Sequence, residues 1–162
     1  MTSEYVTLGH PDRTADYISE YILDRYVEKD PDTRYAVEVQ IKDNWVSLVG
    51  EVTSKAEFTD AERAEFVRRA IAEVGYTPEY AAKWPAGCAL DSSKVEVAQH
   101  ISRQSQDIAA GVDAGGWGDQ GIFWGMAAPD KDHDYMPLDH WYAKKIGDFL
   151  YEKRFGGLDI KT

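Results

Sequence analysis

The sequence predicts an α+β fold of two layers, in which helices pack on one face of a mostly antiparallel sheet. Helical apolar spacing near residues 15–27 and 59–75 brackets two alternating segments over residues 35–53. The alternating segments are joined by a connection of hairpin length, which favours antiparallel pairing. With 162 residues and 43% apolar content, the chain can form one domain with a sizeable core, with or without a smaller second unit.

The first helix is expected over residues 15–27, after turn and capping residues at 9–14. Alternation over residues 35–41 and 45–53 predicts a β-hairpin that turns at residues 43–44. One face of this hairpin then carries four facing pairs: Lys42 and Trp45, Gln40 and Ser47, Glu38 and Val49, and Ala36 and Glu51. The opposite, apolar face is expected to form the core.

A capping box predicts the start of the second helix, because Thr59 is followed three residues later by Glu62. Gly75 should end this helix. Residues 94–102 alternate as a further strand, whose polar side leads to Gln104.

The last third of the chain begins with a glycine-rich stretch at residues 111–121. A short strand is expected at residues 122–127, and a helix at about 138–154. No internal repeat or low-complexity tract is evident.

The charge balance excludes several classes of partner. The chain has 29 acidic and 18 basic residues and a formal net charge of −11, so neither nucleic acid nor an anionic membrane is expected to bind it. No apolar run has the length of a membrane span, and the polar start lacks the features of a signal peptide, so a cytoplasmic location is expected. Cys88 is the only cysteine, which excludes an internal disulfide, and it is expected to be a buried, inert thiol.

Five short motifs occur in a fixed order: GHPDR at residues 9–13, GEVT at 50–53, QSQDI at 104–108, GDQG at 118–121 and DIKT at 159–162. Together they resemble the S-adenosylmethionine synthetase family, which writes them as GHPDK, GGE[IV]T, QSPDI, GAGDQG and D-x-K-[ST]. The resemblance runs along nearly the whole chain and corresponds to the first two-fifths of the family's usual length. It implies an S-adenosylmethionine synthetase-like fold, with the N-terminal domain at residues 1–110 and a truncated start of the central domain at 111–162.

The GHPDR segment precedes a predicted helix N-terminus, where free N–H groups favour an anion. Taken alone, it is also compatible with an ordinary capped turn. By the resemblance, His10 contacts the triphosphate of ATP, Asp12 binds Mg²⁺, and Arg13 takes the place of the family's phosphate-binding lysine. Asp159 and Lys161 are implied to bind phosphate as well, with catalytic roles for His10 and Lys161.

Glu38 and Glu51 are predicted to be diagonal neighbours on one sheet face, roughly 7–8 Å apart between strands. They are expected to repel unless a cation or ammonium group lies between them, although two solvated glutamates are an alternative. By the resemblance, Glu38 binds K⁺ and Glu51 binds the amino group of methionine. Gln104 is implied to hold the methionine carboxylate region, and Asp119 the bound methionine and adenosine.

Two departures from the family pattern affect the implied site. Leu8 stands where the family commonly has a glutamate that contacts the nucleotide, and the segment between residues 113 and 116 is shorter than in many members. The family also supplies further lysines, an arginine and a metal-binding aspartate from its second half. A composite or split enzyme is therefore expected.

The resemblance implies formation of S-adenosylmethionine from ATP and methionine, with Mg²⁺ and K⁺ as cofactors. The partners would be copies of the same chain, at least as a dimer, or a chain that carries the missing C-terminal half. The alternative is a non-catalytic module that binds methionine, ATP or S-adenosylmethionine in a regulatory or assembly role.

Overall fold

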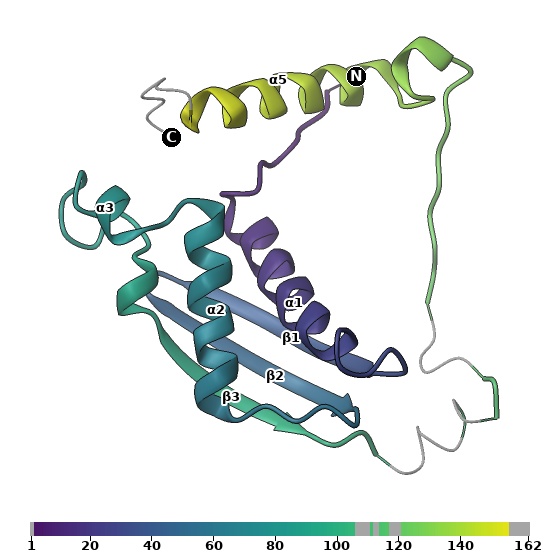
Figure 1. The fold of residues 1–162 in the computed structure, drawn as a ribbon. Coiled ribbons are helices and arrows are strands. Elements are labelled where there is room, and N and C mark those ends of the chain that lie inside the picture. The colour runs from purple at the N-terminus through teal and green to yellow at the C-terminus, as the bar shows by residue number, and fades with distance from the viewer. Residues whose placement is uncertain (1, 106–110, 112–113, 117–120, 156–162) are drawn as a thin grey trace. The chain divides into compact units, whose positions relative to one another are not determined.

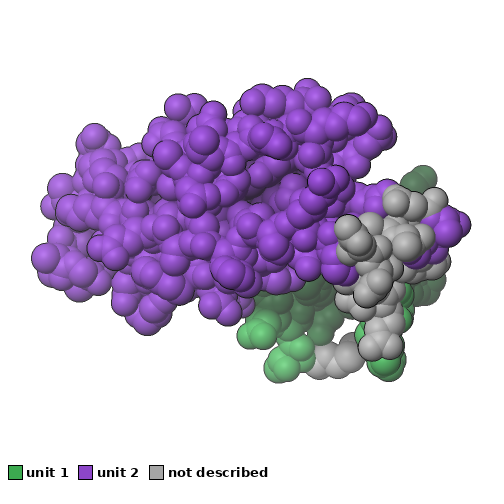
Figure 2. Space-filling model, turned by 90° about the horizontal axis from the view of Figure 1, so that it is seen from below, with its two compact units in different colours: residues 1–10, 119–162 green, residues 11–118 purple. Residues whose placement is uncertain are grey.

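The computed structural model describes residues 2–105, 111, 114–116 and 121–155. It divides into two compact units, one formed by residues 11–118 and the other by residues 1–10 and 119–162 (Figure 2). No helix among the described residues is long and apolar enough to cross a membrane.

The larger unit is a two-layer α+β structure, which confirms the predicted class. Its elements follow in the order α1 (Pro11–Val27), β1 (Arg34–Lys42), β2 (Trp45–Thr53), α2 (Asp60–Val74), α3 (Pro78–Ala81), a 3-10 turn (Ser92–Lys94) and β3 (Glu96–Ser102). The strands form one sheet in the order β1-β2-β3, and α1 and α2 lie side by side over one of its faces (Figure 1).

The predicted hairpin forms in the predicted register, with Glu38 opposite Val49 and Ala36 opposite Glu51. At its turn, Asp43 adopts a positive φ of 52°. The third strand pairs in parallel with β2. This difference from the antiparallel pairing of the hairpin follows from the connection, because residues 54–95 form a crossover that contains α2.

The core lies between the two helices and the sheet. Its fully buried members come from α1, β2 and α2: Ile18, Ile22, Val46, Leu48, Val67, Ala70, Ile71 and Val74, all at 0% exposure. The capping box of Thr59 and Glu62 forms as predicted, and Gly75 ends α2 in the left-handed conformation. The apolar periodicity of the sequence therefore predicts the core residues, and the capping signals predict both ends of α2.

The hairpin turn also positions the start of β3. The Asn44 side-chain oxygen accepts a hydrogen bond from the Asp91 backbone N–H at 2.8 Å, and its backbone oxygen accepts one from Glu96 N–H at 2.8 Å. Asp91 is 4% exposed and caps the 3-10 turn by accepting from Ser93 N–H at 3.0 Å. Hydrogen bonding from Lys94 is the main cause that holds the pKa of the Asp91 carboxyl below its usual value.

Gly50 of β2 lies close against the backbone of β1. Its φ is +154°, and a Cβ at this position would lie 2.0 Å from the backbone oxygen of Ala36. Only glycine fits without moving β1, so the residue before Glu51 brings the two strands together at this point.

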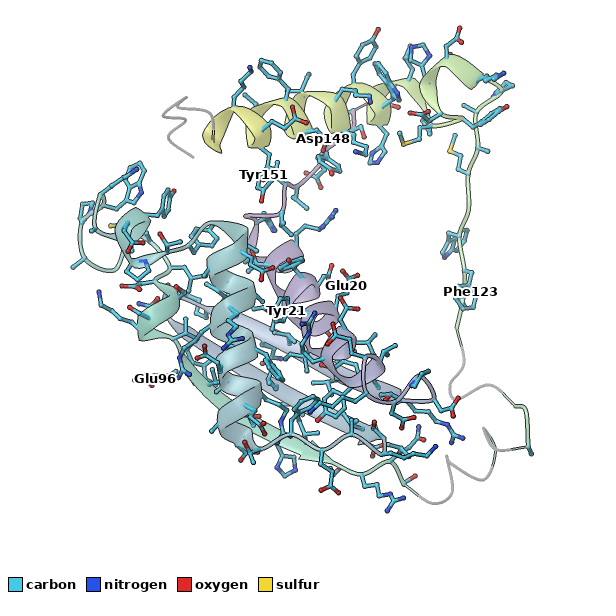
Figure 3. The ribbon with its side chains drawn as sticks, viewed as in Figure 1. Glu20, Tyr21, Glu96, Phe123, Asp148 and Tyr151 are labelled. Atoms are coloured by element: carbon cyan, nitrogen blue, oxygen red, sulfur yellow. The ribbon has the colours of Figure 1, made fainter. Side chains whose placement is uncertain are left out.

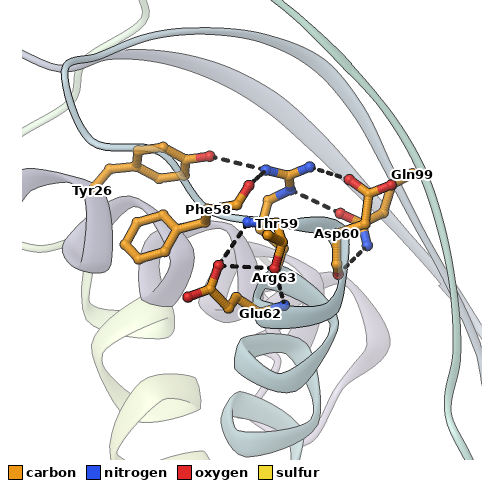
Figure 4. Close-up of polar contacts among 7 residues, drawn as sticks. All are labelled: Tyr26, Phe58, Thr59, Asp60, Glu62, Arg63 and Gln99. Atoms are coloured by element: carbon orange, nitrogen blue, oxygen red, sulfur yellow. Dashed lines mark hydrogen bonds and ion pairs between the residues drawn. The ribbon is translucent and has the colours of Figure 1, made fainter.

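Arg63 of α2 organises a network of polar contacts at the end of the helix layer (Figure 4). Its side chain is 12% exposed and donates hydrogen bonds to Gln99 Oε1 at 2.9 Å, to the Phe58 backbone oxygen and to Tyr26 Oη at 3.4 Å. Its other terminal nitrogen pairs with Asp60 at the exposed side of the network. A guanidinium therefore joins α1, α2 and β3.

Asp30 joins the turn after α1 to the turn after β2. Its side chain is 5% exposed and accepts hydrogen bonds from Lys55 N–H at 2.7 Å, Ser54 Oγ at 3.2 Å and Asp32 N–H at 3.3 Å. The Lys55 N–H is the main cause that lowers the pKa of Asp30 below its ordinary value of 3.8. These bonds favour the ionised carboxylate.

We expect Asp30→Asn to destabilise the chain at neutral pH and to reduce its sensitivity to acid. Because the pKa of Asp30 is lower in the folded chain, its stabilising contribution is complete above the unfolded value and is lost as the pH falls below 3.8. Urea unfolding followed by circular dichroism measures the free energy of unfolding of each protein. The difference between wild type and variant should become smaller as the pH is lowered. A difference in unfolding free energy that stays constant with pH would contradict this account.

The smaller unit contains the N-terminal segment, a 3-10 turn (Lys131–His133) and α5 (Leu138–Phe155). Tyr5 lies against α5, since a Cβ on Gly147 would be 2.6 Å from the Tyr5 ring. Ser3 Oγ is 3.1 Å from His140 Nδ1. α5 thus forms close to the predicted residues 138–154.

The strand predicted at residues 122–127 is not formed. Its composition suits a strand, but a strand also needs a neighbour that satisfies its backbone groups. The described residues provide no such neighbour.

Candidate functional site

The sheet face opposite the helices carries the candidate residues of β1 and β2. Strand by strand, this open face consists of Ala36, Glu38, Gln40 and Lys42, then Trp45, Ser47, Val49 and Glu51, then Glu96, Ala98, His100 and Ser102. The side chains of Glu38 and Val49 are exposed, and Glu51 is half-buried.

Glu38 and Glu51 are diagonal neighbours across β1 and β2, as the sequence predicts. In the described part of the chain, neither carboxylate has a hydrogen-bond or ion-pair partner. Diagonal neighbours in a sheet lie roughly 7–8 Å apart at the backbone, so two such glutamates on one face favour a cation or an ammonium group between them. The geometry therefore suits a positively charged ligand.

Gln104 lies just beyond β3, whose last residue Ser102 pairs with Glu51. The Gln104 Oε1 atom is buried and has no hydrogen-bond partner in the described part of the chain. Buried polar atoms are rarely left unpaired, and a glutamine amide offers both donors and an acceptor. Gln104 therefore offers a buried acceptor, two residues beyond the partner of Glu51.

Helix α1 begins at Pro11, four residues earlier than predicted, so Asp12 and Arg13 belong to its first turn. Proline suits the first helical position because it has no N–H to leave unpaired. The side chains of Asp12 and Arg13 are exposed. An exposed cation beside the positive end of a helix is compatible with an anion such as a phosphate.

His10 precedes this helix and belongs to the smaller unit, whereas Asp12 and Arg13 belong to the larger one. Its side chain is exposed, and its backbone N–H donates to the Thr7 oxygen at 2.9 Å.

No group of three or more His, Cys, Asp or Glu side chains that could hold a metal ion is present among the described residues. Magnesium in nucleotide sites is usually bound by one or two carboxylates together with phosphate oxygens and water. Asp12 fits that role only as one ligand beside a nucleotide. Glu38, with Glu51 nearby, fits a weakly held monovalent cation such as K⁺.

Asp119, Asp159 and Lys161 lie outside the described residues, so their roles stay predictions. Leu8 is half-buried in the smaller unit.

His100 lies on the open face opposite Val49, on the polar side of β3 that the alternation predicts, but it was not predicted as a site residue. Cys88 is exposed, which corrects the prediction of a buried thiol, because it lies in a surface loop after α3.

Comparisons with known proteins show the family to which the chain is similar. The family model described as the S-adenosylmethionine synthetase N-terminal domain matches residues 1–106. The S-adenosylmethionine synthase of Zymomonas mobilis is 40% identical over 159 residues, which cover 95% of this chain and 38% of that protein. A solved S-adenosylmethionine synthetase from Campylobacter jejuni, described as unusual, is 31% identical with a TM-score of 0.84, over 97% of this chain and 38% of that one. The chain thus spans about two-fifths of the length of these relatives.

Proposed function

The chain belongs to the S-adenosylmethionine synthetase family, and from this premise we propose that it takes part in forming S-adenosylmethionine from ATP and methionine. In this reaction the methionine sulphur forms a bond to C5′ of ATP while the bond from C5′ to the triphosphate oxygen breaks. A thioether sulphur has a free electron pair, so no general base is needed. Catalysis then depends on alignment and on stabilising the leaving triphosphate.

The observation that carries this proposal is the place of Glu51 at the end of β2, opposite Ser102, with Gln104 two residues beyond Ser102 along the chain. Methionine carries an ammonium and a carboxylate on the same carbon. The unpartnered Glu51 carboxylate suits the ammonium group. The Nε2 group of Gln104 could donate to the methionine carboxylate, while its buried, unpaired Oε1 could accept from the ammonium group. Asp119 is proposed to hold the bound methionine and adenosine.

The phosphate end of the proposed site would be formed by the first turn of α1. Arg13 would bind the triphosphate and Asp12 would hold Mg²⁺, whose charge would stabilise the leaving group. His10, Asp159 and Lys161 are proposed to contact the phosphates, with His10 and Lys161 acting on the leaving triphosphate. Glu38 is proposed to hold K⁺ near the methionine.

We propose that the N-terminal domain covers residues 1–110 and that residues 111–162 begin the central domain, a division supported by the match of residues 1–106. The chain would act in the cytoplasm as one part of a composite site. The rest of that site would come from a polypeptide that corresponds to the remaining length of the relatives.

The first test is Glu51→Gln, which should weaken methionine binding by roughly 10- to 150-fold, since a charge-assisted hydrogen bond contributes roughly 1.5–3 kcal/mol. ATP binding should change little. Isothermal titration calorimetry with each ligand measures both effects. Glu96→Gln is the matched control, because Glu96 lies on the same face at the other end of the sheet. Unchanged methionine affinity with weakened ATP affinity would contradict the assignment.

A second substitution, Asp12→Asn, should raise the Mg²⁺ concentration needed for ATP binding by about tenfold or more, because it removes one charged ligand. Nucleotide binding is measured as a function of Mg²⁺. Asp16→Asn is the control, one helical turn further along the same exposed side of α1. If the Mg²⁺ titrations of the variant and the wild type overlay, Asp12 is only a helix-terminal residue.

A further inference from the structure

The turn that leads into α5 has a strained backbone. Asp130 caps its 3-10 turn (Lys131–His133) by accepting a hydrogen bond from Asp132 N–H at 3.1 Å. The next two residues, Asp134 and Tyr135, both adopt the left-handed conformation, with φ values of 56° and 58°. Aspartate tolerates this conformation, but it is unusual for a bulky residue such as tyrosine. Such strained residues persist only where surrounding contacts hold them in place.

His133 provides contacts of this kind, because it joins the turn to α5. Its Nδ1 atom is 2.6 Å from Asp130 Oδ2. Its ring lies nearly perpendicular to the Trp141 indole, at 84° with ring centroids 4.7 Å apart, and its centroid is 6.3 Å from that of Tyr142. The Trp141 Nε1 atom has no hydrogen-bond partner in the part of the chain that the structure describes. Packing of the rings therefore holds the turn on the first turns of α5.

The charged groups around the imidazole come from the turn and from α5. The Asp130 carboxylate pairs with it directly, and the hydrogen bond with the imidazole is the main cause that holds the pKa of Asp130 below its usual value of 3.8. On α5, the Lys145 Nζ atom is 5.4 Å from the centroid of the Trp141 ring. The neighbouring Lys144 is paired with Asp148 at 2.5 Å, further along the helix (Figure 3). A protonated imidazole is the stronger donor to the ionised Asp130 carboxylate.

We propose that Asp130, His133 and Trp141 form a pH-sensitive latch, which holds the turn on α5 while the imidazole is protonated and loosens when the imidazole loses its proton. Histidine is the side chain that commonly changes charge between pH 5 and 8. Asp132 and Asp134, which flank His133 in the chain, also favour the positive charge.

The direction of the pH dependence follows from these charges. Because the pKa of Asp130 is lowered in the folded chain, the contribution of this carboxylate is complete above 3.8 and is lost as the pH falls below that value. The contribution of the imidazole is lost at the other end, as its positive charge disappears with rising pH. The latch should therefore be tightest at mildly acidic pH and looser above neutral pH.

A fixed structural contact is the alternative, because a neutral imidazole can donate the same hydrogen bond from Nδ1–H. Such a contact would hold the turn equally well at mildly acidic and at alkaline pH, so the pH dependence distinguishes the two. The inference does not depend on the proposed function, because the latch lies within the smaller unit and its test uses no substrate.

Hydrogen exchange of the whole chain, followed by NMR, tests the latch through two amides of the turn. The Tyr135 N–H donates to the Asp130 backbone oxygen at 2.9 Å, and the Met136 N–H donates to the His133 backbone oxygen at 3.0 Å. After correction for the intrinsic effect of pH on exchange, both amides should be protected roughly three- to tenfold more at about pH 5.5 than at about pH 8. The amides of α2 are the internal reference, and their protection should stay constant.

Two substitutions separate the charge from the shape of the turn. Asp130→Asn keeps a residue that can cap the turn but removes its charge, so the difference between the two pH values should disappear. His133→Lys keeps a positive charge over the whole range and should also remove the difference. His140→Gln is the matched control on α5, because His140 Nδ1 lies 3.1 Å from the hydroxyl of Ser3. This variant should behave as the wild type.

Equal protection of the two amides at both pH values in the wild type would overturn the proposal, and this measurement requires no variant. A pH dependence that persists in a folded Asp130→Asn chain, or one that is lost in His140→Gln, would overturn it as well. Circular dichroism of each variant confirms folding.

Discussion

The 162-residue polypeptide alone is expected to form S-adenosylmethionine at least about 10⁴-fold more slowly than the same chain mixed with the remaining part of a relative. A triphosphate leaving group carries about four negative charges. Besides metal ions, the proposed site provides only Arg13, Lys161 and His10 to oppose these charges. Each preorganised donor at a developing charge contributes roughly 3–4 kcal/mol, so the absence of two donors lowers the rate by about four to six orders of magnitude.

Product formation in the presence of ATP, methionine, Mg²⁺ and K⁺ measures this difference. Glu51→Gln in the mixed sample is the control that ties the restored rate to the site on this chain. Efficient turnover by the purified chain would refute the prediction. It would mean that copies of this short chain build a whole site together.

The largest effect on stability is expected for Arg63→Met, which should lower the free energy of unfolding by about 2–4 kcal/mol. The substitution keeps an unbranched side chain but leaves the Phe58 oxygen and Gln99 Oε1 without their donor. A buried polar group without a partner costs roughly 1–3 kcal/mol. Urea unfolding followed by circular dichroism measures the loss.

Arg69→Met on the same helix is the matched control. The Arg69 side chain is 61% exposed and pairs with Glu65 at 3.0 Å. Exposed ion pairs contribute roughly 0–1 kcal/mol, so this variant should retain nearly full stability. Equal losses for the two variants would show that the network around Arg63 contributes no more to the free energy of unfolding than an exposed ion pair does.

Local signals predicted much of the larger unit correctly. The two-residue connection after Lys42 determined the hairpin register, and Thr59, Glu62 and Gly75 marked the ends of α2. Alternation alone placed Glu38 and Glu51 on the same face, because side chains of a strand point to opposite faces in turn.

Features that depend on contacts between distant parts of the chain could not be predicted from local sequence patterns. The parallel pairing of β3 depends on the path of the crossover through α2, which no local pattern contains. The network around Arg63 joins residues from α1, α2 and β3, and the unpaired oxygen of Gln104 depends on what buries it. The segment at residues 122–127 has the composition of a strand, but its conformation depends on a neighbour that the described residues do not provide.

Because a crossover connects β2 to β3, the residues of the proposed methionine site are expected to come together at different stages of folding. Glu38 and Glu51 come together when the local hairpin closes, which requires only a short loop. Gln104 joins them only after residues 54–95 have closed a much longer loop, with the Asn44 turn receiving the start of β3. We therefore expect a chain that has folded its hairpin and helices to carry the paired carboxylates before it can recognise an amino acid.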